Sequence, residues 1–385
     1  MPVYLDHAAT TPMLGEAIEA YTGALGIVGN PASIHSQGQN AKRLLEEARE
    51  RVAASVGADA IEVVFTSGGT ESINLGVKGL YWSRNADGSR PRVLVPRGEH
   101  HATIDAVEWL ETHEGATIEW IAVDDEGRVR IDVLEAALGD DVALVTMLAA
   151  NNEVGTIQPV AEVATLAAAH GVPVHVDAVS AYRHMPIDFA EWGVAALSVS
   201  AHKIGGPLGI GALVLARSAT VEPLIHGGGQ QRRVRSGTQD APAAIAFGVA
   251  ARHEHASLVR LRDRVIAGVL ERVPSAILRG SRHDRIENNA HFTFPGCEGD
   301  SLLYLLDVAG VSVSTGSACQ AGVPEASHVL IAMGLDEADA RGALRITVGH
   351  TTTDADVDAM LDALPAAVER ARRAGYADRA VGSRG

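Results

Sequence analysis

Short apolar runs alternate with amphipathic segments through the first two thirds of the chain. Runs typical of buried strands occupy 61–66, 92–96, 117–123, 142–148, 172–177, 198–203 and 210–215. Apolar residues at helical spacing precede the first run at 36–56, the first helix that we expect, and also lie between later runs. Repeated strand–helix alternation indicates a mainly parallel sheet that is covered by helices on both faces.

The last third of the chain alternates on a smaller scale. We expect helices across 241–273, then strands at 289–295, 311–314 and 343–348, a helix at 301–308 and a closing helix over 354–373. The extended segment 1–11 precedes the first alternating unit. The predicted organisation is therefore a large domain at 12–255 and a small α+β domain made from 1–11 and 256–385.

Composition limits the classes of partner. The 385 residues contain 32 Lys and Arg against 48 Asp and Glu, which gives a net charge of -16 and argues against nucleic acid. There is neither an apolar leader at the N-terminus nor an apolar run of the ~20 residues that span a bilayer. The two cysteines, Cys297 and Cys319, cannot form a disulfide framework. We expect a cytoplasmic protein without a membrane partner.

Polar residues follow the predicted strands, at the edge where parallel sheets bind ligands. A glycine turn with Gly69 and Thr70 opens one helix, where backbone N–H groups and the helix dipole favour an anion such as phosphate. Elsewhere His100, Asn152, Asp177 and the stretch Ser200-Ala201-His202-Lys203 come at strand ends. This set suits pyridoxal 5'-phosphate: the lysine amine condenses with its aldehyde, the aspartate keeps its ring nitrogen protonated, and the glycine turn holds its phosphate.

Two other interpretations use the same residues. A metal could bind to a cluster of His100, His101, His175, Asp177 and His202. The spacing gives no helical His pair with a downstream carboxylate, so it does not favour a metal. The alternative without chemistry is a doubly wound protein in which the polar strand ends are incidental.

A series of motifs resembles the cysteine desulfurases, the class V aminotransferase-like group of fold type I enzymes, and most closely the branch that feeds iron-sulfur cluster assembly and tRNA thiolation. The motifs are Tyr4-Leu5-Asp6-His7-Ala8-Ala9-Thr10-Thr11-Pro12, 29–33, 65–72, 99–100, 151–155, 175–178, 202–203, 226–229, 235–238, 314–319 and 344–345. The resemblance implies an aspartate aminotransferase-like fold, with a mainly parallel seven-stranded sheet in the large domain and a small α+β domain.

The resemblance also implies roles for single residues. Lys203 would hold pyridoxal 5'-phosphate and His100 would stack on its ring and help to move protons. The other cofactor-binding residues would be Gly69, Thr70, Asn152, Asp177, Ser180, Ser200, His202 and, from the neighbouring subunit of a homodimer, Thr238. Arg345, Asn152 and Asn30 would bind the substrate. Cys319 would be the nucleophilic thiol, while Cys297 is interpreted as structural.

The implied reaction converts L-cysteine to L-alanine and leaves a persulfide on Cys319 for a sulfur-acceptor protein. Selenocysteine lysis or another β-elimination is the alternative reaction, and a pseudo-enzyme that relays sulfur is the alternative without catalysis. Four residues depart from the family pattern. Ser180 stands where a Gln usually contacts the phenolic oxygen of the cofactor, Arg183 and Ala201 replace glycines, and Gln230 replaces a His.

Overall fold

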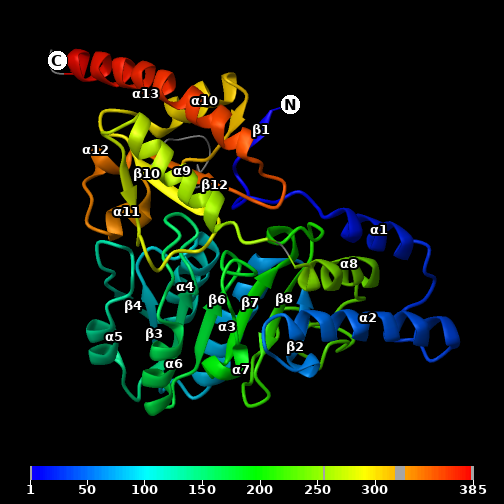
Figure 1. Ribbon diagram of the computed structural model, residues 1–385. Helices are drawn as coiled ribbons and strands as arrows, with labels where there is room; N and C mark the ends of the chain where they lie inside the picture. Colours follow the sequence, from blue (N-terminus) through cyan, green and yellow to red (C-terminus); the bar gives the residue numbers. More distant parts are fainter. Residues whose placement is uncertain (1, 255, 317–325, 383–385) are drawn as a thin grey trace.

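A seven-stranded sheet organises the larger part of the molecule (Figure 1). The structure, a computed structural model, describes residues 2–254, 256–316 and 326–382. The strands are β2 (Val63–Thr66), β3 (Arg92–Pro96), β4 (Thr117–Ile121), β5 (Val142–Leu148), β6 (Val174–Asp177), β7 (Ala196–Ser200) and β8 (Gly211–Leu215), in the order β2-β8-β7-β6-β5-β3-β4. All neighbours are parallel except the two pairs that β8 makes with β2 and β7. The predicted mainly parallel, seven-stranded sheet is confirmed.

Helices cover both faces of this sheet because successive strand residues point to opposite sides. Val64 of β2 packs in the core with α3 (Gly69–Arg84) and α4 (His101–Glu114), whereas Phe65 packs in the opposite core. The opposite core includes α1 (Gly15–Ala24), α2 (Ser36–Ala54), α5 (Ile131–Ala137), α6 (Val160–Ala169), α7 (Phe189–Trp192) and α8 (Ala241–Arg252). Helix α1 was not predicted, since its buried residues are only Ala17 and Ala24 and give little apolar periodicity.

The smaller part has its own core around an antiparallel sheet. Its strands are β9 (Ile277–Arg279), β10 (Asn289–Thr293) and β12 (Ala343–Thr347), in the order β12-β10-β9. The helices α9 (Val259–Arg272), α10 (Gly299–Val308) and α13 (Asp354–Gly382) accompany this sheet, and β1 (Val3–Tyr4) pairs in parallel with β11 (Val311–Ser312). The N-terminal strand therefore lies beside late elements of the chain (Figure 1).

Two short helices connect the parts. Helices α11 (His328–Ala332) and α12 (Glu337–Ala340) pack with Val154, from the turn after β5, in a small separate cluster. The predicted helical stretch 241–273 is divided between the parts: α8 packs in the large core and α9 in the small one. Leu261, Val265 and Val269 give α9 the buried stripe that its sequence periodicity indicates. None of the helices among the described residues has the length and apolar character needed to cross a membrane.

Candidate active site

A cavity of about 400 Å³ lies at the carboxyl ends of β5, β6 and β7. The candidate residues that line it are Gly69, Thr70, His100, Asn152, Asp177, Ser180, Ser200, His202, Lys203 and Arg345. Arg345 comes from β12, in the smaller part, and the other candidates come from the larger part. The sequence-distant candidates thus meet in one hollow between the two parts of the fold.

Lys203 follows β7 directly. The predicted strand at 198–203 ends at Ser200, because Ile204 N and Gly206 N both donate to the carbonyl of Ala201 and turn the chain into a short 3-10 helix, Ala201–Lys203. Lys203 Nζ donates to the carbonyl oxygens of Ala8 and Ala9, the latter at 3.0 Å. Burial, and then the charge of Arg345, lowers the pKa of Lys203 from 10.5 to about 8. A sizeable fraction of this amine is therefore neutral near pH 7.5.

Asp177 is the last residue of β6, next to Leu148 and Ser198 on the neighbouring strands. Its Oδ1 accepts from Val179 N at 2.9 Å. Burial raises the pKa of Asp177 from 3.8 to about 6, in spite of the backbone donor and the charge of Lys203. A cationic group in the cavity would stabilise a buried carboxylate of this kind. The protonated nitrogen of a pyridine ring is such a group.

The phosphate candidates surround the start of α3. A Cβ on Gly69 would lie 2.8 Å from Val179 Cγ2, so the close approach of these two segments requires glycine at position 69. Ser200 Oγ is buried and has no hydrogen-bond partner among the described residues. An unsatisfied buried hydroxyl beside the N-terminus of a sixteen-residue helix suits an anion that accepts from both.

His100 and Glu99 lie at the start of α4. His100 Nδ1 accepts from Ala102 N at 3.1 Å and caps the helix. Desolvation by the walls of the cavity, and then the charge of Lys203, lowers the pKa of His100 to about 4, so its ring is neutral at pH 7. Glu99 Oε1 accepts from Leu148 N at 2.8 Å, and burial raises the pKa of Glu99 well above its ordinary value.

Arg345 is buried and held from two directions. Its Nη1 donates to the carbonyl of Asn152 at 2.8 Å, and its Nη2 donates to Asp6 Oδ1 at 3.1 Å. Its Nε has no acceptor among the described residues. Asn152 Oδ1 is likewise buried without a donor. The planar guanidinium therefore retains N–H groups that a carboxylate could use.

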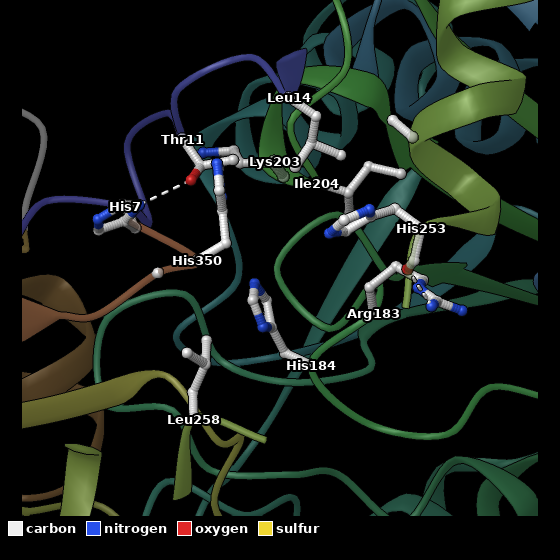
Figure 2. A pocket seen from close by; sticks show the side chains of 12 residues that line it. His7, Thr11, Leu14, Arg183, His184, Lys203, Ile204, His253, Leu258 and His350 are labelled. Atoms are coloured by element: carbon white, nitrogen blue, oxygen red, sulfur yellow. Dashed lines mark hydrogen bonds between the residues drawn. The ribbon is translucent and has the colours of Figure 1, made fainter. Parts of the chain in front are cut away.

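A second, much smaller cavity of about 30 Å³ borders Lys203 (Figure 2). Several histidines line it, and among them His7 Nδ1 shares a hydrogen bond with Thr11 Oγ1 at 2.7 Å. Burial, and then the charge of His350, lowers the pKa of His7 to about 4. A Cβ on Gly349 would lie 2.0 Å from His7 Nδ1, so this ring packs directly on the backbone after β12. His7 thereby fixes the segment whose Ala8 and Ala9 carbonyls accept hydrogen bonds from Lys203.

Two candidates do not line the active-site cavity of about 400 Å³, and a third lies outside the described residues. Thr238 and Asn30 are exposed and do not line it, and Asn30 Oδ1 accepts from Ala32 N at 2.9 Å. Cys319 lies outside the described residues, although Gly316 and His328, which flank that gap, line the cavity. Cys297 is buried, and burial raises the pKa of its thiol, in agreement with a structural role.

The cavity also includes groups to which the sequence analysis gave no role. Ala8, Ala9 and Glu153 line it. The Asp6 carboxylate, paired with Arg345, and the buried Glu99 side chain do not line the cavity but contact residues around it. All of them fall within the motifs at 4–12, 99–100 and 151–155, and these motifs were the available signal.

The alternative metal cluster does not form around His175. This side chain is buried, and its two ring nitrogens share hydrogen bonds of 2.9 Å with Thr146 Oγ1 and Ser198 Oγ. Its ring packs against α3, where a Cβ on Gly76 would lie 2.5 Å from Cδ2. Across residues 2–254, 256–316 and 326–382, no three His, Cys, Asp or Glu side chains are grouped as metal ligands.

The fold and the cavity agree with the comparisons to known proteins. The family model described as Aminotransferase class-V matches residues 3–360, and the chain belongs to the class V aminotransferase family. Its relatives within that family include cysteine desulfurases. The IscS-like cysteine desulfurase of Mycobacterium tuberculosis is 52% identical over 385 residues, which cover 97% of this chain and 98% of that protein. Cysteine desulfurase IscS of Dictyoglomus turgidum is 41% identical over 378 residues, covering 96% and 95% of the two chains.

Solved structures show the same architecture. A NifS-like protein matches with a TM-score of 0.87 at 32% identity, over 96% of this chain and all of that one. The structure titled "SspA in complex with cysteine" matches with a TM-score of 0.81 at 30% identity, over 91% and 99% of the two chains. The expected fold type I architecture and the resemblance to cysteine desulfurases are both confirmed.

Proposed function

We propose that this protein is a pyridoxal 5'-phosphate-dependent cysteine desulfurase that converts L-cysteine to L-alanine and collects the sulfur on Cys319. The observation that carries the proposal is the single cavity that joins a lysine of lowered pKa, a buried aspartate of raised pKa and a buried arginine. The desulfurase names of relatives that match nearly the whole chain support the reaction.

The cavity suits the cofactor in charge and in hydrogen bonding. Lys203 would hold it covalently and Asp177 would pair with its ring nitrogen. Gly69, Thr70, Ser200 and His202 would bind its phosphate, and Asn152 and Ser180 would border its ring beside His100. When bound, pyridoxal 5'-phosphate supplies an electron sink for the pair that remains when the substrate loses its α-proton. The unsatisfied Ser200 hydroxyl is the feature of this chain that most directly supports a phosphate.

Side chains of the cavity would bind the substrate and transfer its protons. Arg345 binds the carboxylate of L-cysteine, and Asn152 assists it. Lys203 accepts the α-proton, which a partly neutral amine can do near neutral pH. His100 is neutral at that pH, and because its Nδ1 accepts from Ala102 N, its Nε2–H can donate a hydrogen bond in the cavity. The N-terminal segment positions the lysine amine, because the Ala8 and Ala9 carbonyls accept hydrogen bonds from Lys203 Nζ.

The sulfur step belongs to Cys319. Its thiolate attacks the sulfur of L-cysteine, so that an S–S bond forms while the substrate Cβ–S bond breaks. The electron pair of the broken bond stays on carbon and a proton replaces the sulfur there. The overall change is L-cysteine plus the Cys319 thiol to L-alanine plus a Cys319 persulfide, with no outside oxidant or reductant.

A homodimer and a sulfur acceptor complete the proposal. Thr238 is exposed and does not line the cavity of its own chain, so we place it against the phosphate in a second copy of the chain. Asn30, also exposed, is assigned to substrate contact. The persulfide would pass to an acceptor protein in the cytoplasm.

The test is the Cys319→Ser variant of the purified holoenzyme. Alanine release from L-cysteine is expected to fall on the order of 1,000-fold or more, because the hydroxyl cannot take the sulfur. The visible absorbance of the bound cofactor and its sensitivity to borohydride should persist. Cys297→Ala, which removes the buried thiol, serves as the control and should keep the activity. A fully active Cys319→Ser variant would refute the assignment, and efficient turnover of selenocysteine alone would favour a lyase.

A further inference from the structure

The N-terminal segment contacts both charged side chains on which substrate binding depends. The Asp6 carboxylate accepts from Arg345 Nη2, and the carbonyls of Ala8 and Ala9, two and three residues later, accept from Lys203 Nζ. Asp6 and Arg345 are 339 positions apart in the chain. This segment is therefore a structural part of the cavity.

Asp6 is held in place independently of Arg345. Its backbone forms a bridge with Thr347, two residues beyond Arg345 on the same strand. Ala8 N donates to Thr347 Oγ1 at 2.9 Å, and Ala9 N donates to the Asp6 carbonyl at 3.0 Å. The Tyr4 hydroxyl donates to the same carbonyl at 3.1 Å. These hydrogen bonds fix the backbone of Asp6, so its carboxylate can orient the guanidinium of Arg345.

Arg345 needs that support for two reasons. Its side chain is 6% exposed, and an unpaired buried guanidinium is unfavourable. Its charge also acts on Lys203, whose pKa it lowers, whereas Asp6 acts in the opposite direction. Within the described residues, Asp6 supplies the carboxylate that is ion-paired with Arg345. Asp6 itself is absent from the lining of the cavity, so it acts through the arginine.

We propose that Asp6 is a positioning residue of the carboxylate subsite. Asp6 and the Asn152 carbonyl fix Nη2 and Nη1, and the remaining N–H groups of Arg345 then meet an α-carboxylate in a set orientation. Selection for α-amino acids over simple amines thus depends on a residue that does not touch the substrate. The inference rests on the proposed function, because it assigns the carboxylate of L-cysteine to Arg345.

Three variants of the holoenzyme separate geometry from charge. Asp6→Asn keeps an acceptor oxygen at the same place without the charge, Asp6→Glu keeps the charge but moves it, and Asp6→Ala removes both. The readout is the change in visible cofactor absorbance on titration with L-alanine and, in parallel, with ethylamine, which is L-alanine without its carboxylate. Glu369→Gln, which removes an exposed ion pair with Arg373 in α13, is the matched control.

Asp6→Ala and Asp6→Glu should weaken L-alanine binding about tenfold, while Asp6→Asn stays within about threefold of wild type. Ethylamine binding should be unchanged in all three variants. For L-cysteine turnover the loss should appear in KM rather than in kcat. If Asp6→Ala does not fold, the contrast between the Asn and Glu variants still decides the question.

Unchanged or tightened binding of L-alanine in Asp6→Ala and Asp6→Glu would overturn the proposal, as would an equal loss for ethylamine. The proposed function fails separately: wild-type enzyme that binds L-alanine through Arg345 but releases no alanine from L-cysteine would contradict the desulfurase assignment and leave the role of Asp6 intact.

Discussion

Burial determines the protonation of the cavity residues. It lowers the pKa of Lys203 to about 8 and raises the pKa of Asp177 to about 6. Each shift brings the group close to neutral pH, where a small change in local charge alters its protonation. The fold therefore places a lysine that can act as a base and an aspartate that can pair with a cation in one cavity.

Arg183 adopts a backbone conformation that is unfavourable for its type. Its φ is +65°, in the left-handed region that favours glycine, and its side chain donates to the His253 carbonyl at 2.5 Å. Both Arg183→Gly and Arg183→Ala lose that hydrogen bond. We expect the glycine variant to be more stable than the alanine variant by about 1 kcal/mol, because only alanine retains the strain. Urea unfolding measures the difference, and equal stabilities would show that the backbone is not strained.

The residues that follow strands within motifs, such as Lys203 and Asp177, could be predicted because their place depends on local sequence alone. The resemblance to the desulfurases added Arg345, which lies on a strand of the other part. Asp6 could not be recognised in its role, since its partner is distant in the chain and the ion pair exists only after both parts have folded. The roles assigned to all of these residues, and to Thr238 and Asn30, stay predictions.

Helix α3 illustrates how one element determines the placement of its neighbours. At Gly76 the helix approaches the ring of His175 so closely that a Cβ would lie 2.5 Å from Cδ2 and 2.9 Å from Nε2. The ring cannot turn away without losing its hydrogen bonds to Thr146 and Ser198. A glycine in a helix interior normally reduces stability, but here it permits the contact between helix and sheet.

Gly76→Ala should consequently destabilise the protein by about 1–3 kcal/mol, the usual cost of overpacking. Gly23→Ala, in α1, is the matched substitution, because nothing lies within 4 Å of the Cβ it would add. This control should stabilise the protein by up to about 1 kcal/mol through helix propensity. Chemical denaturation of both variants checks the pair, and a neutral Gly76→Ala would mean that the ring can move.

At this scale the strands of the large sheet were predictable, whereas helices α1, α7 and α12 and strand β9 were not. The strands contain uninterrupted buried apolar residues, for example in all seven positions of β5. Helix α1 buries only two alanines, so its contact with α8 depends on backbone proximity rather than on an apolar stripe. The end of β7 at Ser200 was also missed, because the turn that stops it is made by backbone hydrogen bonds.

The stability of the whole molecule should depend on pH through its buried histidines. Burial lowers the pKa of His175 and of His291 to about 3, below the ordinary value of 6.5. Their contribution is complete above pH 6.5 and is lost as the pH falls toward 3, because the unfolded chain binds the proton more readily. Asp177 acts in the opposite sense: its raised pKa favours the fold below pH 3.8, and this contribution is lost as the pH rises through about 6.

We therefore compare wild type with His175→Gln by urea unfolding at pH 7, 6 and 5. The advantage of the wild type should decline below pH 6.5, by up to about 1.4 kcal/mol per pH unit, since the variant lacks one titrating group. A difference that does not vary with pH would contradict neutral burial of His175.

The two separate hydrophobic cores were indicated by the sequence, because the alternation of strands and helices changes in scale between the first two thirds and the last third of the chain. How the parts meet could not be predicted from local patterns, because residues far apart in the chain, such as Lys203 and Arg345, line the cavity between them. The domain limits, 12–255 for the large domain and 1–11 with 256–385 for the small one, stay a prediction.

The placement of the N-terminal strand affects the order in which the protein becomes functional during synthesis. Residues 3–11 leave the ribosome before the rest of the described fold, yet their backbone hydrogen bonds reach His202, Gly310, Ser312 and Thr347. A chain that ends before β12 lacks Arg345, the ion-pair partner of Asp6. Nascent or C-terminally truncated chains would then lack the arginine that binds the carboxylate of the amino acid. Reactive sulfur would be released only by completed molecules.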